Sequence, residues 1–153
     1  MREPKTNIPA LLLNARPNGS RIAFLPADVD RRFSRDLLPD HGQLLANLLR
    51  WAVKDNVPLS VQGAGLIDCH LYQQPRRFIL HLVNLTNAAT WRQPVDELIP
   101  VGPLRVTLRL PPAVAPRRLQ LLVGKRTIES DATDGQVHFE VPSILDHEVV
   151  VIG

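Results

Sequence analysis

The stretch from Phe24 to Gly42 concentrates the residues of this sequence that are most able to do chemistry. It reads FLPADVDRRFSRDLLPDHG and holds four aspartates, three arginines and a histidine. Carboxylates and an imidazole could bind a hard cation or act as a general acid and base. The candidate residues are Asp28, Asp30, Asp36, Asp40 and His41.

The spacing of these residues favours a charged surface segment over a catalytic or metal site. A calcium loop needs a glycine midway and a glutamate at its end, and neither is found at the required offset. Asp30 and Asp36 also lie beside arginines that can neutralise them. We therefore predict a solvated loop with ion pairs that leads into a helix capped by Asp40, with a small metal-dependent enzyme as the weaker alternative.

The remaining sequence adds no recognisable active-site pattern. The histidines show no HExxH spacing, no serine lies in a GxSxG elbow, and the glycines of QGAGL lack a dinucleotide fingerprint. Cys69 is the only cysteine, which rules out a disulfide within the chain and a thiolate metal cage. The prediction is a chain with no catalytic residue, no metal ligand and no cofactor.

The first third of the chain reads as a hairpin followed by a helix. Apolar runs at Ile8–Asn14 and Arg21–Pro26 are separated by a turn that contains Asn18-Gly19. Leucines at helical spacing then predict a helix from about Asp40 to Lys54, with Gln43 completing a capping box. Trp51 lies beside the apolar stripe of this helix, where packing against a core or an interface is expected.

Beyond Asn56 the apolar period changes from helical to alternating. Short alternating segments separated by Pro, Gly, Asp and Thr are typical of an antiparallel β-sandwich or barrel. We therefore expect a β-β-α unit at residues 1–56 and an all-β domain at residues 57–153. The predicted strands are Leu66–Gln73, Arg77–Leu85, Leu104–Leu110, Leu119–Val123, Gln136–Val141 and Glu148–Ile152.

Charge distribution bears on the partners of the chain. Residues 1–56 hold nine basic and six acidic side chains, and residues 57–153 hold nine of each. The basic residues alternate with aspartates and lack interleaved aromatics, which argues against a nucleic-acid surface. No signal peptide and no apolar run of membrane-spanning length is present, so a cytoplasmic protein without a membrane anchor is expected.

Five residues are candidates for contact with other molecules. Arg31, Arg32 and Arg35 could meet acidic groups of a neighbouring subunit, and Trp51 could seat against a partner domain. Trp91 follows a polar loop between two predicted strands, where an exposed indole could stack on a sugar ring.

Several phrases, in order, resemble one family: RIAFLPADVDRRF, LPDHGQLLANLLRWA, LHLVNLT, DELIPVGPLRV and VPSILDHEVVVI. They are similar to the C-terminal part of β-galactosidase-like glycoside hydrolases, which include a hypothetical glycosyl hydrolase group. The resemblance runs from about Ile8 to Ile152.

The resemblance implies a domain order for the chain. In the family, a catalytic (β/α)8 barrel precedes a trimerisation domain with a Rossmann-like, glutamine amidotransferase-like fold, and a small β-domain ends the chain. Residues 8–54 would be the last hairpin and helix of the trimerisation domain. Residues 57–153 would be the terminal β-domain. No segment here matches the barrel, so none of the carboxylates inherits a catalytic role, and a truncated product or separately encoded tail is expected.

The leading hypothesis is a non-catalytic accessory region of a bacterial glycoside hydrolase that works in domain packing or oligomerisation. Its partners would be other domains or subunits of the hydrolase, including copies of itself. The alternative is a free-standing carbohydrate-binding β-sandwich that holds sugar through Trp91.

Overall fold

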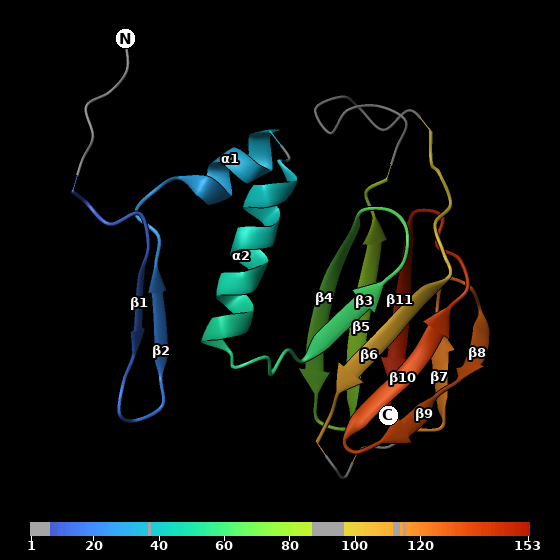
Figure 1. The fold of residues 1–153 in the computed structure, drawn as a ribbon. Helices are drawn as coiled ribbons and strands as arrows, with labels where there is room; N and C mark the ends of the chain where they lie inside the picture. The colour runs from blue at the N-terminus through green and yellow to red at the C-terminus, as the bar shows by residue number, and fades with distance from the viewer. Residues whose placement is uncertain (1–6, 37, 87–96, 112–113, 115) are drawn as a thin grey trace. The chain divides into compact units, whose positions relative to one another are not determined.

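A computed structural model describes residues 7–36, 38–86, 97–111, 114 and 116–153. The chain divides into two compact units, Met1–Val57 (unit 1) and Pro58–Gly153 (unit 2). In the described residues, eleven strands form three antiparallel sheets and two helices complete the fold (Figure 1). The predicted mainly β class, with an antiparallel β-sandwich, is confirmed.

Unit 1 begins with a hairpin of two four-residue strands, β1 (Leu12–Ala15) and β2 (Arg21–Phe24). Its turn is closed by the Arg16 amide, which donates to the Ser20 carbonyl at 2.9 Å. Gly19 has φ +82°, a conformation that glycine adopts without steric cost. The hairpin lies where the sequence predicted it, although β1 begins later than the apolar run at Ile8.

The charged stretch holds a helix where the sequence predicted a loop. Helix α1 spans Val29–Asp36, with Asp30 in its first turn and Arg35 in its last. These positions suit the helix dipole, which favours acidic groups at the N-terminus and basic groups at the C-terminus. We correct the loop to a helix, because ion pairs between successive turns stabilise the segment in that form.

Helix α2 spans Pro39–Ala52, and the predicted cap at Asp40 is wrong. The capping position belongs to Leu38, which makes no side-chain cap, and Asp40 lies inside the first turn. Proline is favoured at the first helical position because its ring fixes φ and no N–H is needed there. Gln43 does not complete a capping box. Its amide donates to Asn47 Oδ1 at 2.8 Å.

A close contact joins the two helices of unit 1. A Cβ placed on Gly42 would lie 2.7 Å from Cε2 of the Phe33 ring, which is closer than packed atoms approach. Glycine at position 42 therefore lets the phenyl ring of α1 rest directly on the backbone of α2.

Unit 2 is a sandwich of two sheets. The four-stranded sheet has the order β3-β6-β10-β9, and the five-stranded sheet has the order β4-β5-β11-β7-β8 (Figure 1). The strands of the first sheet are β3 (Leu59–Gln62), β6 (Leu104–Arg109), β10 (Gln136–Val141) and β9 (Asp131–Thr133). Those of the second are β4 (Ile67–Gln74), β5 (Arg77–Asn84), β11 (His147–Ile152), β7 (Arg118–Leu121) and β8 (Arg126–Glu129).

The sequence missed three of these strands. β3, β8 and β9 have three or four residues each, and their alternation is too short to stand out. All three are the outermost described strands of their sheets.

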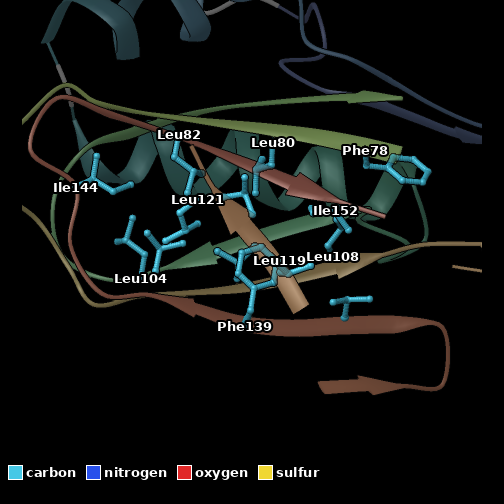
Figure 2. Close-up of a cluster of buried hydrophobic side chains, with 14 of the residues drawn as sticks. Phe78, Leu80, Leu82, Leu104, Leu108, Leu119, Leu121, Phe139, Ile144 and Ile152 are labelled. Atoms are coloured by element: carbon cyan, nitrogen blue, oxygen red, sulfur yellow. The ribbon is translucent and has the colours of Figure 1, made fainter. Parts of the chain in front are cut away.

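The core of unit 2 lies between the two sheets. Every second residue of β5, β6, β10 and β11 is buried, as side chains alternate across a strand. Figure 2 shows the larger side chains from both sheets meeting in this space. The buried apolar residues are Phe78, Leu80, Leu82, Val101, Leu104, Val106, Leu108, Leu110, Leu119, Leu121, Val137, Phe139, Val141, Ile144, Val150 and Ile152.

Two polar side chains occupy inward positions of the five-stranded sheet. The Glu148 carboxylate, 3% exposed, accepts hydrogen bonds from the amides of Val123, Gly124 and Val149 at 2.9–3.0 Å. It thereby ties the turn between β7 and β8 to β11. A buried carboxylate needs such donors, since an unpartnered one would be strongly destabilising.

Asn84 fixes the end of β5 in a similar way. Its side-chain amide donates to the carbonyls of Ile99 and Leu145, both at 2.7 Å, and its Oδ1 accepts from the Thr86 amide at 2.9 Å. Asn84-Leu85-Thr86 matches a glycosylation sequon, but the residue is only 6% exposed and its nitrogen is engaged.

Candidate functional site

Unit 1 has no core of its own within its described residues. No side chain among residues 7–36 and 38–57 is buried. Large apolar side chains remain exposed on its strands, helices and connections. They are Ile8, Leu12, Leu13, Ile22, Phe24, Leu38, Leu49, Val53 and Val57.

A groove of about 640 Å³ runs between β2 and α2 in this unit. Three of the four leucines in the predicted apolar stripe of α2 line this groove, and Leu44 does not. Leu49 lines the groove and is 68% exposed. The lining residues are Arg21, Ile22, Ala23, Leu25, Asp30, Leu45, Leu48, Leu49 and Ala52.

The hairpin carries apolar side chains on both of its faces. Along β2, Arg21 and Ala23 are partly buried while Ile22 and Phe24 are exposed, so alternate residues point to opposite sides. Leu12 pairs with Phe24 and adds to the exposed face. A hairpin that is apolar on both sides is typical of a strand pair inside a sheet that is covered on both faces.

Trp51 is held within unit 1. The Arg21 guanidinium lies 5.3 Å from the centre of the Trp51 ring, and its Nη1 donates to the Trp51 carbonyl at 2.9 Å. This cation–π contact and hydrogen bond join β2 to the end of α2. No sequence signal pointed to Arg21, because its partner lies thirty positions away.

The three arginines of α1 face carboxylates of their own segment. Arg31 Nη1 lies 3.6 Å from Asp28 Oδ2. The Asp36 carboxylate pairs with two arginines, with Arg32 Nη1 at 3.7 Å and Arg35 Nε at 2.7 Å. The hydrogen bond from Arg35 holds the pKa of Asp36 below its usual range and raises the pKa of Arg35. A partner's acidic group would have to compete with these pairs.

The five candidates for acid–base or metal chemistry are not gathered into one site. Asp28 and Asp36 are occupied by arginines, and Asp30 lines the apolar groove. Asp40 is exposed in the first turn of α2, and His41 is partly buried in the same turn. Among the described residues, no group of three or more His, Cys, Asp or Glu side chains could hold a metal ion.

The histidines of β4 and β5 form a small aromatic cluster on unit 2. His70 lies 3.0 Å from the Asp68 carboxylate and stacks on Tyr72, whose ring meets His81 edge-on. At the start of β11, His147 pairs with Asp146 at 3.0 Å, which lowers the pKa of Asp146. These contacts join residues that are close in sequence or on neighbouring strands.

Two further predicted residues stand as follows. Cys69 is half-buried against the core, and burial raises the pKa of its thiol, as expected of an unreactive cysteine. Trp91, the candidate sugar contact, lies outside the described residues. Neither described helix has the length and apolar character needed to cross a bilayer.

Comparison with known proteins gives a structural likeness. No protein-family model and no curated protein sequence matches the chain. Among solved structures, it is similar to alpha-L-fucosidase isoenzyme 2 from Paenibacillus thiaminolyticus, with a TM-score of 0.71 and 22% identity. The chain shares a fold with part of a glycoside hydrolase.

The extent of this likeness is uneven between the two proteins. It covers 94% of this chain and 22% of the fucosidase chain. The match therefore includes both units here, and most of the fucosidase has no counterpart in this sequence. At 22% identity it supports a fold related to glycoside hydrolases, while the β-galactosidase-like assignment stays a prediction.

Proposed function

We propose that this chain is a non-catalytic accessory region of a bacterial, cytoplasmic glycoside hydrolase, working in domain packing or oligomerisation. The observation that carries the proposal is the state of unit 1. Its hairpin is apolar on both faces, its helix leaves a groove open, and no described side chain is buried.

The chemistry of the missing partner follows from this surface. An apolar surface of this kind marks a contact with protein, and its central residues would supply most of the binding free energy. The hairpin needs neighbouring strands at its edges and a layer over Leu12, Ile22 and Phe24. An α/β domain, such as the trimerisation domain implied by the resemblance, offers both.

The structural neighbour supports the same reading. The matched region makes up about a fifth of the fucosidase chain, so this fold occurs inside a larger hydrolase. Within the described residues, the carboxylates and histidines are spread over local pairs, which supports a role outside catalysis.

The test uses the tagged full chain expressed in its native cells. We expect the captured chain to co-purify with an activity that hydrolyses 4-nitrophenyl galactosides or fucosides, and the purified chain alone to show no such activity. Phe24→Lys should abolish the captured activity, because Phe24 is 56% exposed and contributes to the uncovered face. Asn47→Lys, on the exposed side of α2, is the control and should retain it.

Two results would contradict the proposal. One is turnover by the purified chain at a rate that survives further purification. The other is captured activity that is indifferent to Phe24→Lys while circular dichroism shows the variant to be folded.

A further inference from the structure

Among the described residues, one side of the unit 2 sandwich leaves an opening toward the core. Strand β3 is the last described strand of the four-stranded sheet and β4 is the last of the five-stranded sheet, and residues of both line one hollow. The apolar residues of these strands pack on the core yet remain partly exposed. They are Leu59, Val61, Ile67, Cys69 and Leu71.

A hollow of about 310 Å³ lies along this opening, which we call the β3–β4 seam. None of its lining residues is charged, and two of them, Gly63 and Gly65, have no side chain. The lining residues are Leu59, Val61, Gly63, Gly65, Leu66, Ile67, Cys69 and Leu104.

The opposite side of the sandwich is polar. There the chain crosses between the sheets at Ser130, which is buried and donates to the Pro116 carbonyl. The hollow on that side is lined by charged residues, including Arg117, Arg118 and Glu129. The side at Ser130 is therefore charged, as solvated surfaces are, whereas the β3–β4 seam is uncharged and apolar, as contact surfaces are.

The backbone of β4 also presents N–H groups at the seam that need hydrogen-bond acceptors. The Leu85 amide donates to the Leu66 carbonyl at 2.8 Å, which sets the alternation of the β4–β5 ladder. By that alternation, the N–H groups of Cys69, Leu71 and Gln73 point to the open edge. No described strand pairs with this edge, and β4 contains no proline or lysine to block it.

An occupant that pairs with both β3 and β4 would satisfy both sheets at once. It would have to reach two edges that belong to layers about 10 Å apart. A single extended peptide reaches only one of them. Another sandwich edge reaches both, and a two-fold axis perpendicular to the layers sets each strand antiparallel to its own copy. The uncharged lining lets the seam meet itself without repulsion.

We propose that the β3–β4 seam is a self-association surface, on which a second copy of this chain docks edge to edge. Both sheets then continue across the dimer, and Leu66 of each copy enters the contact. This surface is separate from the unit 1 groove, and the inference stands whether or not the proposed function holds.

The test is the mass of the purified full chain by light scattering across a concentration series. Leu66→Lys should raise the dimer dissociation constant at least about 100-fold, because a lysine enters an apolar contact twice. Leu122→Lys is the matched control, since Leu122 is 45% exposed against 52% for Leu66 and does not line the seam.

Two further variants complete the design. Gln73→Pro should also weaken the dimer, because it removes an edge N–H at an exposed position and spares the β5 bonds. It serves in place of Leu66→Lys if that variant fails to fold. Phe24→Lys should leave seam dimerisation unchanged.

The outcomes separate this inference from the proposed function. A dimer lost in Leu66→Lys and Gln73→Pro but kept in Leu122→Lys and Phe24→Lys supports the seam. A chain that stays monomeric, or association lost in Phe24→Lys and kept in Leu66→Lys, overturns it.

Discussion

Replacing Asn84 should destabilise unit 2 through three backbone groups that lose their partner. In Asn84→Ala, the carbonyls of Ile99 and Leu145 and the Thr86 amide are left without the side chain that binds them. These groups are partly buried, and each one left unpaired costs about 1 kcal/mol, so the loss should reach about 3 kcal/mol.

Urea unfolding followed by circular dichroism of the β-sheet signal measures this loss. With a slope of about 1–3 kcal/mol per molar urea, the midpoint should fall by about 1–3 M. Asn84→Asp keeps the shape but turns a carboxylate oxygen toward two carbonyls, so it should be at least as destabilising at pH 7. Its penalty should shrink in acid, since a protonated carboxyl can donate one hydrogen bond.

The control is Asn47→Ala, at an exposed position whose side chain accepts a hydrogen bond from the Gln43 side chain. It should change the free energy of unfolding by less than about 0.5 kcal/mol. The reasoning is refuted if Asn84→Ala costs no more than this control, or if Asn84→Asp matches the wild type at pH 7.

Three other predictions concern single contacts. The pKa of Asp36 is lowered in the folded chain, so its stabilisation of α1 is fully present above the unfolded pKa of about 4 and is lost as pH falls through the folded pKa. Amide exchange in α1 should become faster over that pH range, and Asp36→Asn should abolish this pH dependence. Cys69, with its raised thiol pKa, should react with Ellman's reagent at pH 8 at least about 10-fold more slowly than in urea, and equal rates would contradict its burial. Gly42→Ala should destabilise α1, because the new methyl group clashes with the Phe33 ring, and amide exchange should become faster in α1 alone. Adding Phe33→Ala should remove the clash, and unchanged exchange in Gly42→Ala would show that the helices are not in contact.

The sequence predicted the sandwich because its long strands alternate cleanly. In β5, β6 and β10, every second residue is buried, since a two-residue period leaves only one choice of face. The short strands β8 and β9 carry too few residues for that period to be recognised.

The charged stretch was misread for a different reason. Its aspartates and arginines suggested a loop by composition, whereas their spacing places Asp28 near Arg31 and Asp36 near Arg32 on one helical surface. A charged composition indicates exposure to solvent, whereas opposite charges spaced three or four residues apart favour a helix.

The contacts that define the candidate surfaces lay beyond sequence reasoning. Arg21 and Trp51 meet across thirty residues, and Asn84 reaches carbonyls fifteen and sixty-one residues away. Such pairs depend on the completed fold. The open seam could not be foreseen either, because β3 was not recognised and an edge strand is defined only by its neighbours.

The most direct test of the central proposal is amide exchange of the hairpin β1–β2 in two states of the chain. In the dilute purified chain, its amides should exchange at least about 100-fold faster than those of core strand β5, because no described side chain of unit 1 is buried. In the assembly captured from native cells, the hairpin should become protected while β5 stays unchanged. A hairpin that is as protected as β5 in the dilute purified chain would contradict the account, since unit 1 would then need no partner.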